Sequence, residues 1–194
     1  MFTGIVETTT KIDSKENVGK NIRIAIELSK KWKIKMGDSI AVSGVCLTVS
    51  GIKNNLSKKI YCFDIIPETL SKTTFGKYIY PEVNIERPLV YGARVHGHIV
   101  SGHVDCVGNV LKVTDTAKGY RIEISYPKKF KKYIIPKGSI TVDGVSLTIA
   151  ESKTTSFFVA IIPHTLKITT LSNLEKGDFT NLEFDNKKHV TTKY

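Results

Sequence analysis

The chain contains the stretch Ser39-Ile-Ala-Val-Ser-Gly-Val-Cys-Leu-Thr-Val49, and one hundred residues later it contains Ser139-Ile-Thr-Val-Asp-Gly-Val-Ser-Leu-Thr-Ile149. Seven of these eleven positions are identical. A repeat of this length indicates two copies of one structural unit. The copies differ where Cys46 stands against Ser146 and where Ser43 stands against Asp143. We therefore expect a duplicated fold whose two sites have diverged chemically.

Four further blocks match in the same order along the chain. They pair residues 1–7 with 99–105, 29–32 with 127–130, 65–75 with 161–171, and 83–86 with 180–183, at offsets between 96 and 98. We predict an N-terminal unit at residues 1–88, a C-terminal unit at residues 89–186, and a short tail at residues 187–194.

The pattern of apolar residues is typical of an all-β protein. Isoleucine occupies every second position of residues 21–27, as in a half-buried strand, and residues 120–125 repeat the pattern. Gly44 and Gly144 each mark a tight turn between two short strands. Helical signals are short and begin after Ser29 or Pro127 and at Pro67 or Pro163. Many short strands predict one small closed barrel per unit, because closure removes exposed strand edges.

Composition limits the classes of protein that the chain can belong to. The sequence has no apolar run of 18 residues, which argues against a membrane span, and its first residues lack a signal-peptide pattern. The three cysteines are odd in number and lack zinc-type spacing, so we expect reduced thiols and a cytoplasmic location. Units of about 90 residues bury a limited core, which favours mutual packing or oligomerisation.

The formal net charge of +11 raises the alternative of a nucleic-acid-binding barrel. The lysines form dispersed doublets rather than a tract, and the sequence contains no aromatic ribonucleoprotein motif. We therefore interpret the charge as a solvated basic surface and expect no nucleic-acid partner.

Histidines cluster in the segment His96-Gly-His-Ile-Val-Ser-Gly-His103. On a strand, His96 and His98 would face the same side, which would allow metal binding, but no Cys or carboxylate set completes a metal site. We expect no metal. His103 stands where the first copy has Ile5, and a polar residue in place of an apolar one favours a functional role.

Small hydrogen-bonding side chains line both copies of the repeat. Thr48 and Thr148 lie two residues beyond Cys46 and Ser146, and therefore on the same strand face. Ser39 and Ser139 open the preceding strands. Such a lining suits a polar heterocycle, whereas the sequence contains neither a phosphate-binding loop nor a dinucleotide fingerprint. A buried apolar role for Cys46 is the structural alternative.

Together these motifs resemble the riboflavin synthases of the alpha-chain type over about residues 1–185. The matching stretches are Met1-Phe-Thr-Gly-Ile-Val-Glu7, Gly44-Val-Cys-Leu-Thr-Val49, Glu68-Thr-Leu70, Gly97-His-Ile-Val-Ser-Gly-His-Val-Asp105, Lys137-Gly-Ser-Ile-Thr-Val-Asp-Gly-Val-Ser-Leu-Thr-Ile149 and Ile162-Pro-His-Thr-Leu166.

The resemblance implies two similar six-stranded antiparallel barrels and a dismutation of two 6,7-dimethyl-8-ribityllumazine molecules. A four-carbon unit passes from one to the other and gives riboflavin and 5-amino-6-(ribitylamino)uracil. It implies no metal or organic cofactor. It also implies a homotrimer, with two lumazines at each site between the N-terminal barrel of one subunit and the C-terminal barrel of its neighbour, and an association with lumazine synthase.

The resemblance also implies the roles of individual residues. The predicted catalytic residues are His103 as base or proton relay, Cys46 and Ser39 as groups that activate the lumazine held near Phe2, and Ser146 in the other barrel. The predicted substrate-binding residues are Gly4, Val6, Thr48, Thr69, Val104, Lys137, Thr148, Ile162, Thr165 and Asp185.

Two features depart from the family pattern. His96 stands where the family has the first of two glycines, and only nine residues follow Asp185, where the family has a trimerisation helix. A helix that short is marginal, which weakens the expected trimer. The competing function is that of a non-catalytic lumazine or flavin carrier, and the presence of Phe2, Ser39, Cys46 and His103 argues against it.

Overall fold

A computed structural model describes residues 1–54 and 59–185 of the chain. The strands are β1 (Thr8–Val18), β2 (Asn21–Glu27), β3 (Ser39–Val42), β4 (Val45–Asn54), β5 (Lys59–Ile65), β6 (Glu82–Glu86), β7 (Cys106–Thr116), β8 (Gly119–Ser125), β9 (Ser139–Val142), β10 (Val145–Ser152), β11 (Ser156–Ile161) and β12 (Phe179–Phe184). The helices are α1 (Pro67–Lys72) and α2 (Pro163–Ile168), with the short 3-10 helices η1 (Thr74–Gly76), η2 (Lys128–Tyr133) and η3 (Thr170–Asn173). The predicted tail at 187–194 lies outside the described residues.

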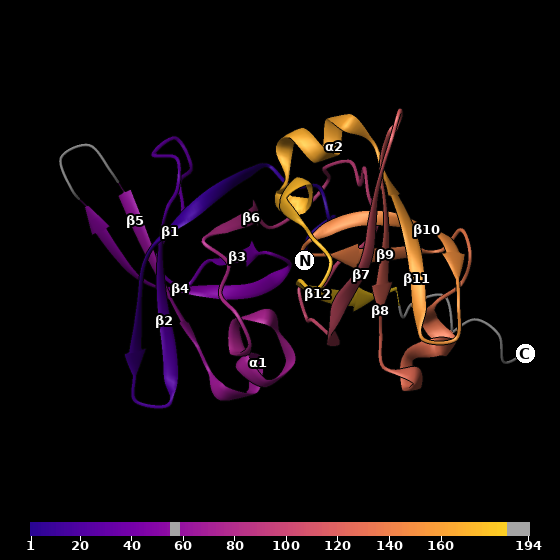
Figure 1. The fold of residues 1–194 in the computed structure, drawn as a ribbon. Coiled ribbons are helices and arrows are strands. Elements are labelled where there is room, and N and C mark those ends of the chain that lie inside the picture. Colours follow the sequence, from indigo (N-terminus) through magenta and orange to yellow (C-terminus); the bar gives the residue numbers. More distant parts are fainter. Residues whose placement is uncertain (55–58, 186–194) are drawn as a thin grey trace, which may run out of the picture.

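Two closed barrels stand side by side (Figure 1). The first has the strand order β1-β2-β5-β4-β3-β6 and the second has the equivalent order β7-β8-β11-β10-β9-β12, with antiparallel neighbours throughout. We call them the N-barrel (β1–β6) and the C-barrel (β7–β12). The prediction of an all-β fold with two six-stranded antiparallel barrels is confirmed.

Local sequence explains why these segments become strands and helices. In β2, Ile24 and Ile26 are fully buried in the N-barrel core, whereas Arg23, directly before Ile24, pairs with Asp64 at 2.6 Å. The two α-helices begin at Pro67 and Pro163, at the position where the missing N–H of proline has no intrahelical partner to lose.

The hairpin turns of the two copies meet between the barrels. Ser43-Gly44 and Asp143-Gly144 each connect two strands with both φ angles positive, which is typical of a two-residue hairpin turn. A Cβ added to Gly44 would lie 2.6 Å from the backbone nitrogen of Gly144. Both turns therefore need glycine for its backbone conformation and for the close approach of the barrels.

Each barrel receives a segment that precedes the other barrel in sequence. Val6 packs in the C-barrel core, and Val104 packs in the N-barrel core. We call residues 1–7 the first exchanged segment and residues 99–105 the second. They meet in an antiparallel bridge in which Phe2 and Val100 exchange backbone hydrogen bonds of 2.7 and 3.0 Å. The N-terminus accordingly lies between the barrels (Figure 1).

Two asparagines from matched positions tie the barrels together. The Nδ2 group of Asn84 in β6 donates to the Asp143 carbonyl at 2.9 Å. In the reciprocal contact, Nδ2 of Asn181 in β12 donates to the Ser43 carbonyl at 2.9 Å. The same amides accept from Thr170 and Thr74 in the facing units. The reciprocal pattern fixes the relative orientation of the two barrels.

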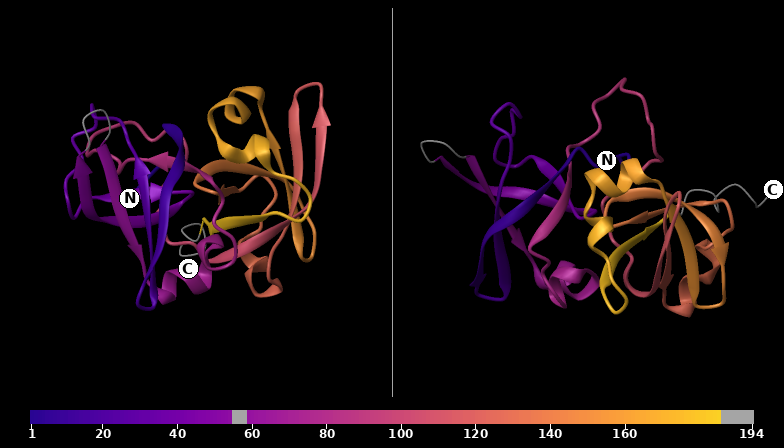
Figure 2. Two further views of the ribbon diagram at one scale, coloured as in Figure 1. Left: turned by 60° about the vertical axis from the view of Figure 1, so that its left-hand side comes forward. Right: turned by 45° about the horizontal axis from the view of Figure 1, so that its top comes forward.

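The connection from β6 to the second exchanged segment is exposed at residues 91–97 and arches away from the barrels (Figure 2). Residues 96–98 form no strand, so the strand geometry that would place His96 and His98 on one face does not occur. In the part of the chain that the structure describes, no helix is long and apolar enough to cross a membrane.

Candidate functional site

Cys46 lies on the outward face of β4 in the N-barrel and is half-buried, while its neighbours Val45 and Leu47 point into the core. Its backbone N–H donates to the Gly102 carbonyl at 2.8 Å, so the second exchanged segment lies directly against it. A pocket of about 390 Å³ opens here, lined by Val45, Cys46, Glu68, Thr69, Lys72, Thr73, Gly102, His103 and Val104.

His103 reaches this pocket because the second exchanged segment crosses to the N-barrel. Val104 anchors the segment in the N-barrel core, and the exposed His103 lies beside Cys46 at the pocket wall. Four predicted site residues, Cys46, Thr69, His103 and Val104, thus line one pocket.

Phe2 lies beneath the Cys46 pocket rather than on its surface. Its side chain is fully buried and packs with Ala41 and Val100, with Cys46 against the same cluster. A Cβ added to Gly102 would come within 3.0 Å of the Phe2 ring. Phe2 therefore supports the floor of the pocket, and its catalytic role stays a prediction.

Ser39 and Thr48 share the outward face of the N-barrel with Cys46. The strand register places Ser39 opposite Thr48 and Ala41 opposite Cys46. Thr48 is exposed and Ser39 is half-buried. Their hydroxyls extend the face that borders the pocket, in the row of small polar groups that the repeat predicts.

Ser146 holds the matched position in the C-barrel and meets the first exchanged segment. Its backbone N–H donates to the Gly4 carbonyl at 2.7 Å, just as Cys46 donates to Gly102. Its hydroxyl lies 2.7 Å from Nδ1 of His98, and Nε2 of that ring lies 3.2 Å from the Thr141 hydroxyl. Ser146 is therefore held on one side by the backbone and on the other by an imidazole.

The other predicted residues of this group lie on the same face as Ser146, on the first exchanged segment or at Lys137. Thr148 is exposed on the same outward face, and Gly4 and Val6 belong to the first exchanged segment. Lys137 is exposed with φ of 64°, where the first copy has Gly37 with φ of 87°. A lysine in this left-handed conformation costs about 1 kcal/mol, which favours a functional reason for its presence.

Two predicted residues of the C-barrel lie at the start of α2. Ile162 is the residue before this helix and is 59% exposed, and Thr165 is half-buried within it. Thr69 occupies the matched place in α1, at the Cys46 pocket. Asp185 follows β12 and is half-buried. The predicted residues thus form two sets, one on each barrel.

The three thiols have different environments. Cys62 and Cys106 are buried, and burial raises the pKa of Cys106 to about 12. Cys46 is the partly exposed thiol among the three. The purely apolar role fits Cys62 and Cys106 better than it fits Cys46, since Cys46 lines a pocket with a histidine. Among residues 1–54 and 59–185, no group of three or more His, Cys, Asp or Glu side chains is placed to hold a metal ion.

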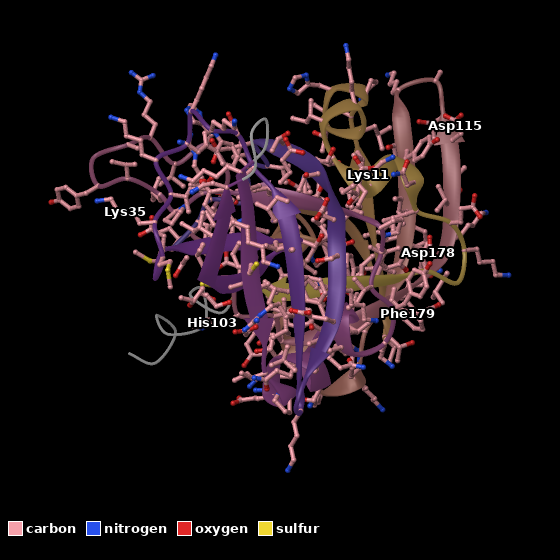
Figure 3. The ribbon with its side chains drawn as sticks, turned by 90° about the vertical axis from the view of Figure 1, so that its left-hand side faces the viewer. Lys11, Lys35, His103, Asp115, Asp178 and Phe179 are labelled. Carbon is pink, nitrogen blue, oxygen red and sulfur yellow. The ribbon has the colours of Figure 1, made fainter. Side chains whose placement is uncertain are left out.

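A larger cavity of about 550 Å³ lies between the barrels and is lined in part by Lys11, Tyr80, Asp143 and Asp178. It contains none of the predicted site residues. In Figure 3, Asp178 at this cavity lies to the right of His103, which is drawn left of centre. We therefore take the smaller pocket at Cys46 as the candidate site, because a thiol, an imidazole and hydroxyls come together there.

Sequence reasoning missed a role for His98 and for two buried glutamates, Glu86 and Glu183. Both glutamates bind the exchanged segments through backbone donors. A signal for them was available, because the matched blocks 83–86 and 180–183 keep the same Asn and Glu in both copies. His98 had no such signal, since it lies just before the matched block 99–105.

Comparison with known proteins agrees with the geometry. The lumazine binding domain matches the chain twice, at residues 3–88 and 101–185. The chain is 40% identical over 187 residues to a riboflavin synthase from Actinobacillus pleuropneumoniae, covering 95% of this chain and 85% of that protein. It is 36% identical to a riboflavin synthase from Bacillus subtilis, again covering 95% and 85%. The chain is 37% identical to a riboflavin synthase from Mycobacterium tuberculosis, covering 100% of this chain and 96% of that protein.

Solved structures with the same fold hold related ligands. LumP complexed with riboflavin superposes with a TM-score of 0.85 and 28% identity, covering 96% of this chain and 100% of that one. LumP complexed with 6,7-dimethyl-8-(1'-D-ribityl) lumazine gives a TM-score of 0.84 at 26% identity, with the same coverage.

Proposed function

The chain belongs to the riboflavin synthase family and carries both of its lumazine-binding domains, and from this premise we propose how its two barrels divide the reaction. It is a transferase of riboflavin biosynthesis. Two molecules of 6,7-dimethyl-8-ribityllumazine together contain the atoms of riboflavin and 5-amino-6-(ribitylamino)uracil. The transfer of four carbons therefore balances without an added oxidant or reductant.

The same substrate must play two roles in this reaction. One lumazine loses a proton from its 7-methyl group and becomes a delocalised anion, and the other accepts a nucleophile at carbon 7. Two sites of different chemistry meet this need, because each can stabilise a different charge. The exchange of Cys46 for Ser146 supplies such a difference at matched places in the two barrels.

His103 is the proposed proton carrier at the Cys46 pocket. An imidazole is the side chain best suited to take and return a proton near neutral pH. Its position beside Cys46 on the pocket wall is the single observation that carries this assignment. The Cys46 thiol and the Ser39 and Thr48 hydroxyls activate and orient the lumazine there.

In the C-barrel, Ser146 and Thr148 hydrogen-bond the second lumazine, and Ile162 and Thr165 cover its ring from the start of α2. Lys137 and Asp185 bind the ribityl chain or balance charge. The exposure of Thr48, Thr148 and Ile162 supports a site that is completed by another subunit. We propose a homotrimer in which the N-barrel of one subunit faces the C-barrel of its neighbour and each site holds two lumazines.

Sedimentation of the protein at several concentrations tests the trimer. Co-sedimentation with lumazine synthase tests the proposed association with that enzyme. We place the protein in the cytoplasm, where its thiols would stay reduced.

Measuring riboflavin formation by Cys46→Ala, Ser146→Ala and His103→Gln tests the assignment of residues. Loss of a proton carrier costs about 100-fold or more in rate, so His103→Gln should show the largest fall in the rate of riboflavin formation. Unimpaired turnover in all three variants would contradict the assignment. A lumazine or flavin carrier is the second candidate, favoured by the similarity of fold to LumP, whose structures contain riboflavin or 6,7-dimethyl-8-(1'-D-ribityl) lumazine; it predicts binding without turnover.

A further inference from the structure

Glu183 in β12 of the C-barrel binds the segment that carries His103. Its Oε1 atom accepts from both the backbone N–H and the hydroxyl of Ser101, each at 2.7 Å. Its Oε2 atom accepts from the backbone N–H of Gly102 at 2.9 Å. Three donors from two adjacent residues thus converge on one carboxylate.

The same residues continue directly to the Cys46 pocket of the other barrel. The Ser101 hydroxyl accepts from the backbone N–H of His103 at 3.1 Å. The Gly102 carbonyl accepts from the backbone N–H of Cys46 at 2.8 Å. Hydrogen bonds through Ser101 and Gly102 therefore connect Glu183 to the backbones of His103 and Cys46.

Glu86 makes the equivalent arrangement in the other direction. Its carboxylate accepts from the backbone N–H and the hydroxyl of Thr3 at 2.6 and 2.8 Å, and from the backbone N–H of Gly4 at 3.0 Å. The Gly4 carbonyl then accepts from Ser146. Glu86 belongs to the N-barrel, whereas Ser146 belongs to the C-barrel.

Both carboxylates are buried, and each therefore depends on its hydrogen bonds. Glu183 is 8% exposed and Glu86 is 5% exposed, and burial raises the pKa of each. A buried carboxylate is unfavourable unless its oxygens are hydrogen-bonded, so each glutamate strongly favours the one segment geometry that supplies all three donors. A shorter or neutral side chain could not accept all three in this way.

We propose that Glu183 is a positioning residue for the Cys46–His103 pocket of the N-barrel, and that Glu86 is the corresponding residue for the Ser146 pocket of the C-barrel. Each barrel thereby builds the pocket of the other within one chain. This inference rests on the proposed function of the two pockets, but its structural part is measurable without turnover.

The variant Glu183→Gln tests the proposal, with Glu86→Gln as its matched control. Glutamine keeps one acceptor oxygen but turns an NH₂ group toward the backbone donor at Gly102 or Gly4. Three readouts are made on the full chain: riboflavin formation, the alkylation rate of Cys46, and the imidazole ¹⁵N resonances of His98 and His103.

We expect each substitution to affect the pocket of the other barrel. Glu183→Gln should shift the His103 resonances and, by loosening Gly102 over the thiol, speed alkylation of Cys46 about fivefold or more. It should lower kcat/KM by about 100-fold, because small displacements of reacting groups are costly. Glu86→Gln should shift the His98 resonances and leave Cys46 alkylation within about twofold of the original protein.

A pattern in which each glutamate affects only the pocket of its own barrel, or both pockets equally, would overturn the proposal. If either glutamine variant fails to fold, Glu183→Asp and Glu86→Asp replace them, since the shorter carboxylate cannot reach all three donors. Glu183→Asp should then shift the His103 resonances and leave those of His98 unchanged, and Glu86→Asp should do the reverse. If the unsubstituted protein forms no riboflavin, the proposed function fails, while the alkylation and resonance patterns still decide the role of the glutamates.

Discussion

The Nδ1 atom of His98 lies 2.7 Å from the hydroxyl oxygen of Ser146. The repeat alone does not suggest this contact, because it pairs Ser146 with Cys46 and pairs His103 with Ile5. Each barrel nevertheless places one imidazole at its matched Cys or Ser position, by a different route along the chain. The two sites are thus similar in composition and different in geometry.

This contact predicts that His98→Gln impairs riboflavin formation. Losing one hydrogen bond to a positioned hydroxyl should lower kcat/KM about tenfold, corresponding to about 1.4 kcal/mol. His96→Gln is the matched control, because His96 is exposed two residues away and should change kcat/KM less than about twofold. Equal effects of the two substitutions would remove His98 from the site.

Exchanging residues between the matched sites gives a second prediction. Cys46→Ser places the residue of the C-barrel in the N-barrel, and the hydroxyl can still donate and accept hydrogen bonds. We expect Cys46→Ser to keep at least about five times the kcat of Cys46→Ala in steady-state assays. An alanine variant as active as the serine variant would restrict Cys46 to a packing role.

The close approach of the two hairpin turns predicts a large loss of stability for Gly44→Ala. The new Cβ would meet the Gly144 backbone at 2.6 Å and would force alanine to adopt a φ of +79°. We expect the free energy of unfolding in urea to fall by more than about 2 kcal/mol. Gly19→Ala is the control, because Gly19 also has positive φ (+62°) but nothing lies within 4 Å, so its cost should be about 1 kcal/mol. Equal costs would mean that the contact between turns contributes nothing.

The buried Asp143 predicts how stability depends on pH. Burial raises its pKa from 3.8 to about 7, so the folded state holds this proton more tightly than the unfolded state does. The protonated Asp143 therefore makes its full contribution to the free energy of unfolding below about pH 4. This contribution is lost as pH rises toward 7, by at most about 1.4 kcal/mol per pH unit.

Asp143→Ser removes this titration and copies Ser43 of the first barrel. Urea unfolding at several pH values should show a smaller decline in stability between pH 4 and 7 for this variant. Part of the decline should persist, because burial also raises the pKa values of Glu86 and Glu183. An unchanged decline would show that Asp143 does not titrate in this range.

Much of the fold could be predicted from the sequence because the signals are local and occur twice. Alternation in residues 21–27 predicted β2, prolines 67 and 163 predicted the two helices, and Gly44 and Gly144 predicted the hairpin turns. The duplication then required that both halves adopt one fold, and the strand orders of the barrels agree with it.

The sites could be predicted only in part, because the exchange of segments is a long-range effect. Of the residues singled out from the sequence, Cys46, Thr69 and His103 line one pocket. Nothing in the local pattern of residues 1–7 indicates that Val6 packs in the C-barrel, or that Glu86 binds Thr3 more than 80 residues away. The strand that would have placed His96 and His98 on one face does not form at 96–98, and His98 instead donates its backbone N–H to the Thr3 carbonyl at 3.1 Å.

The central claim is that this chain makes riboflavin from lumazine alone, and product analysis tests it most directly. The protein is incubated with 6,7-dimethyl-8-ribityllumazine and no other reactant, and the products are separated by chromatography. The account predicts one riboflavin and one 5-amino-6-(ribitylamino)uracil for every two lumazines consumed. Tight lumazine binding without formation of riboflavin would contradict it and would identify the protein as a carrier.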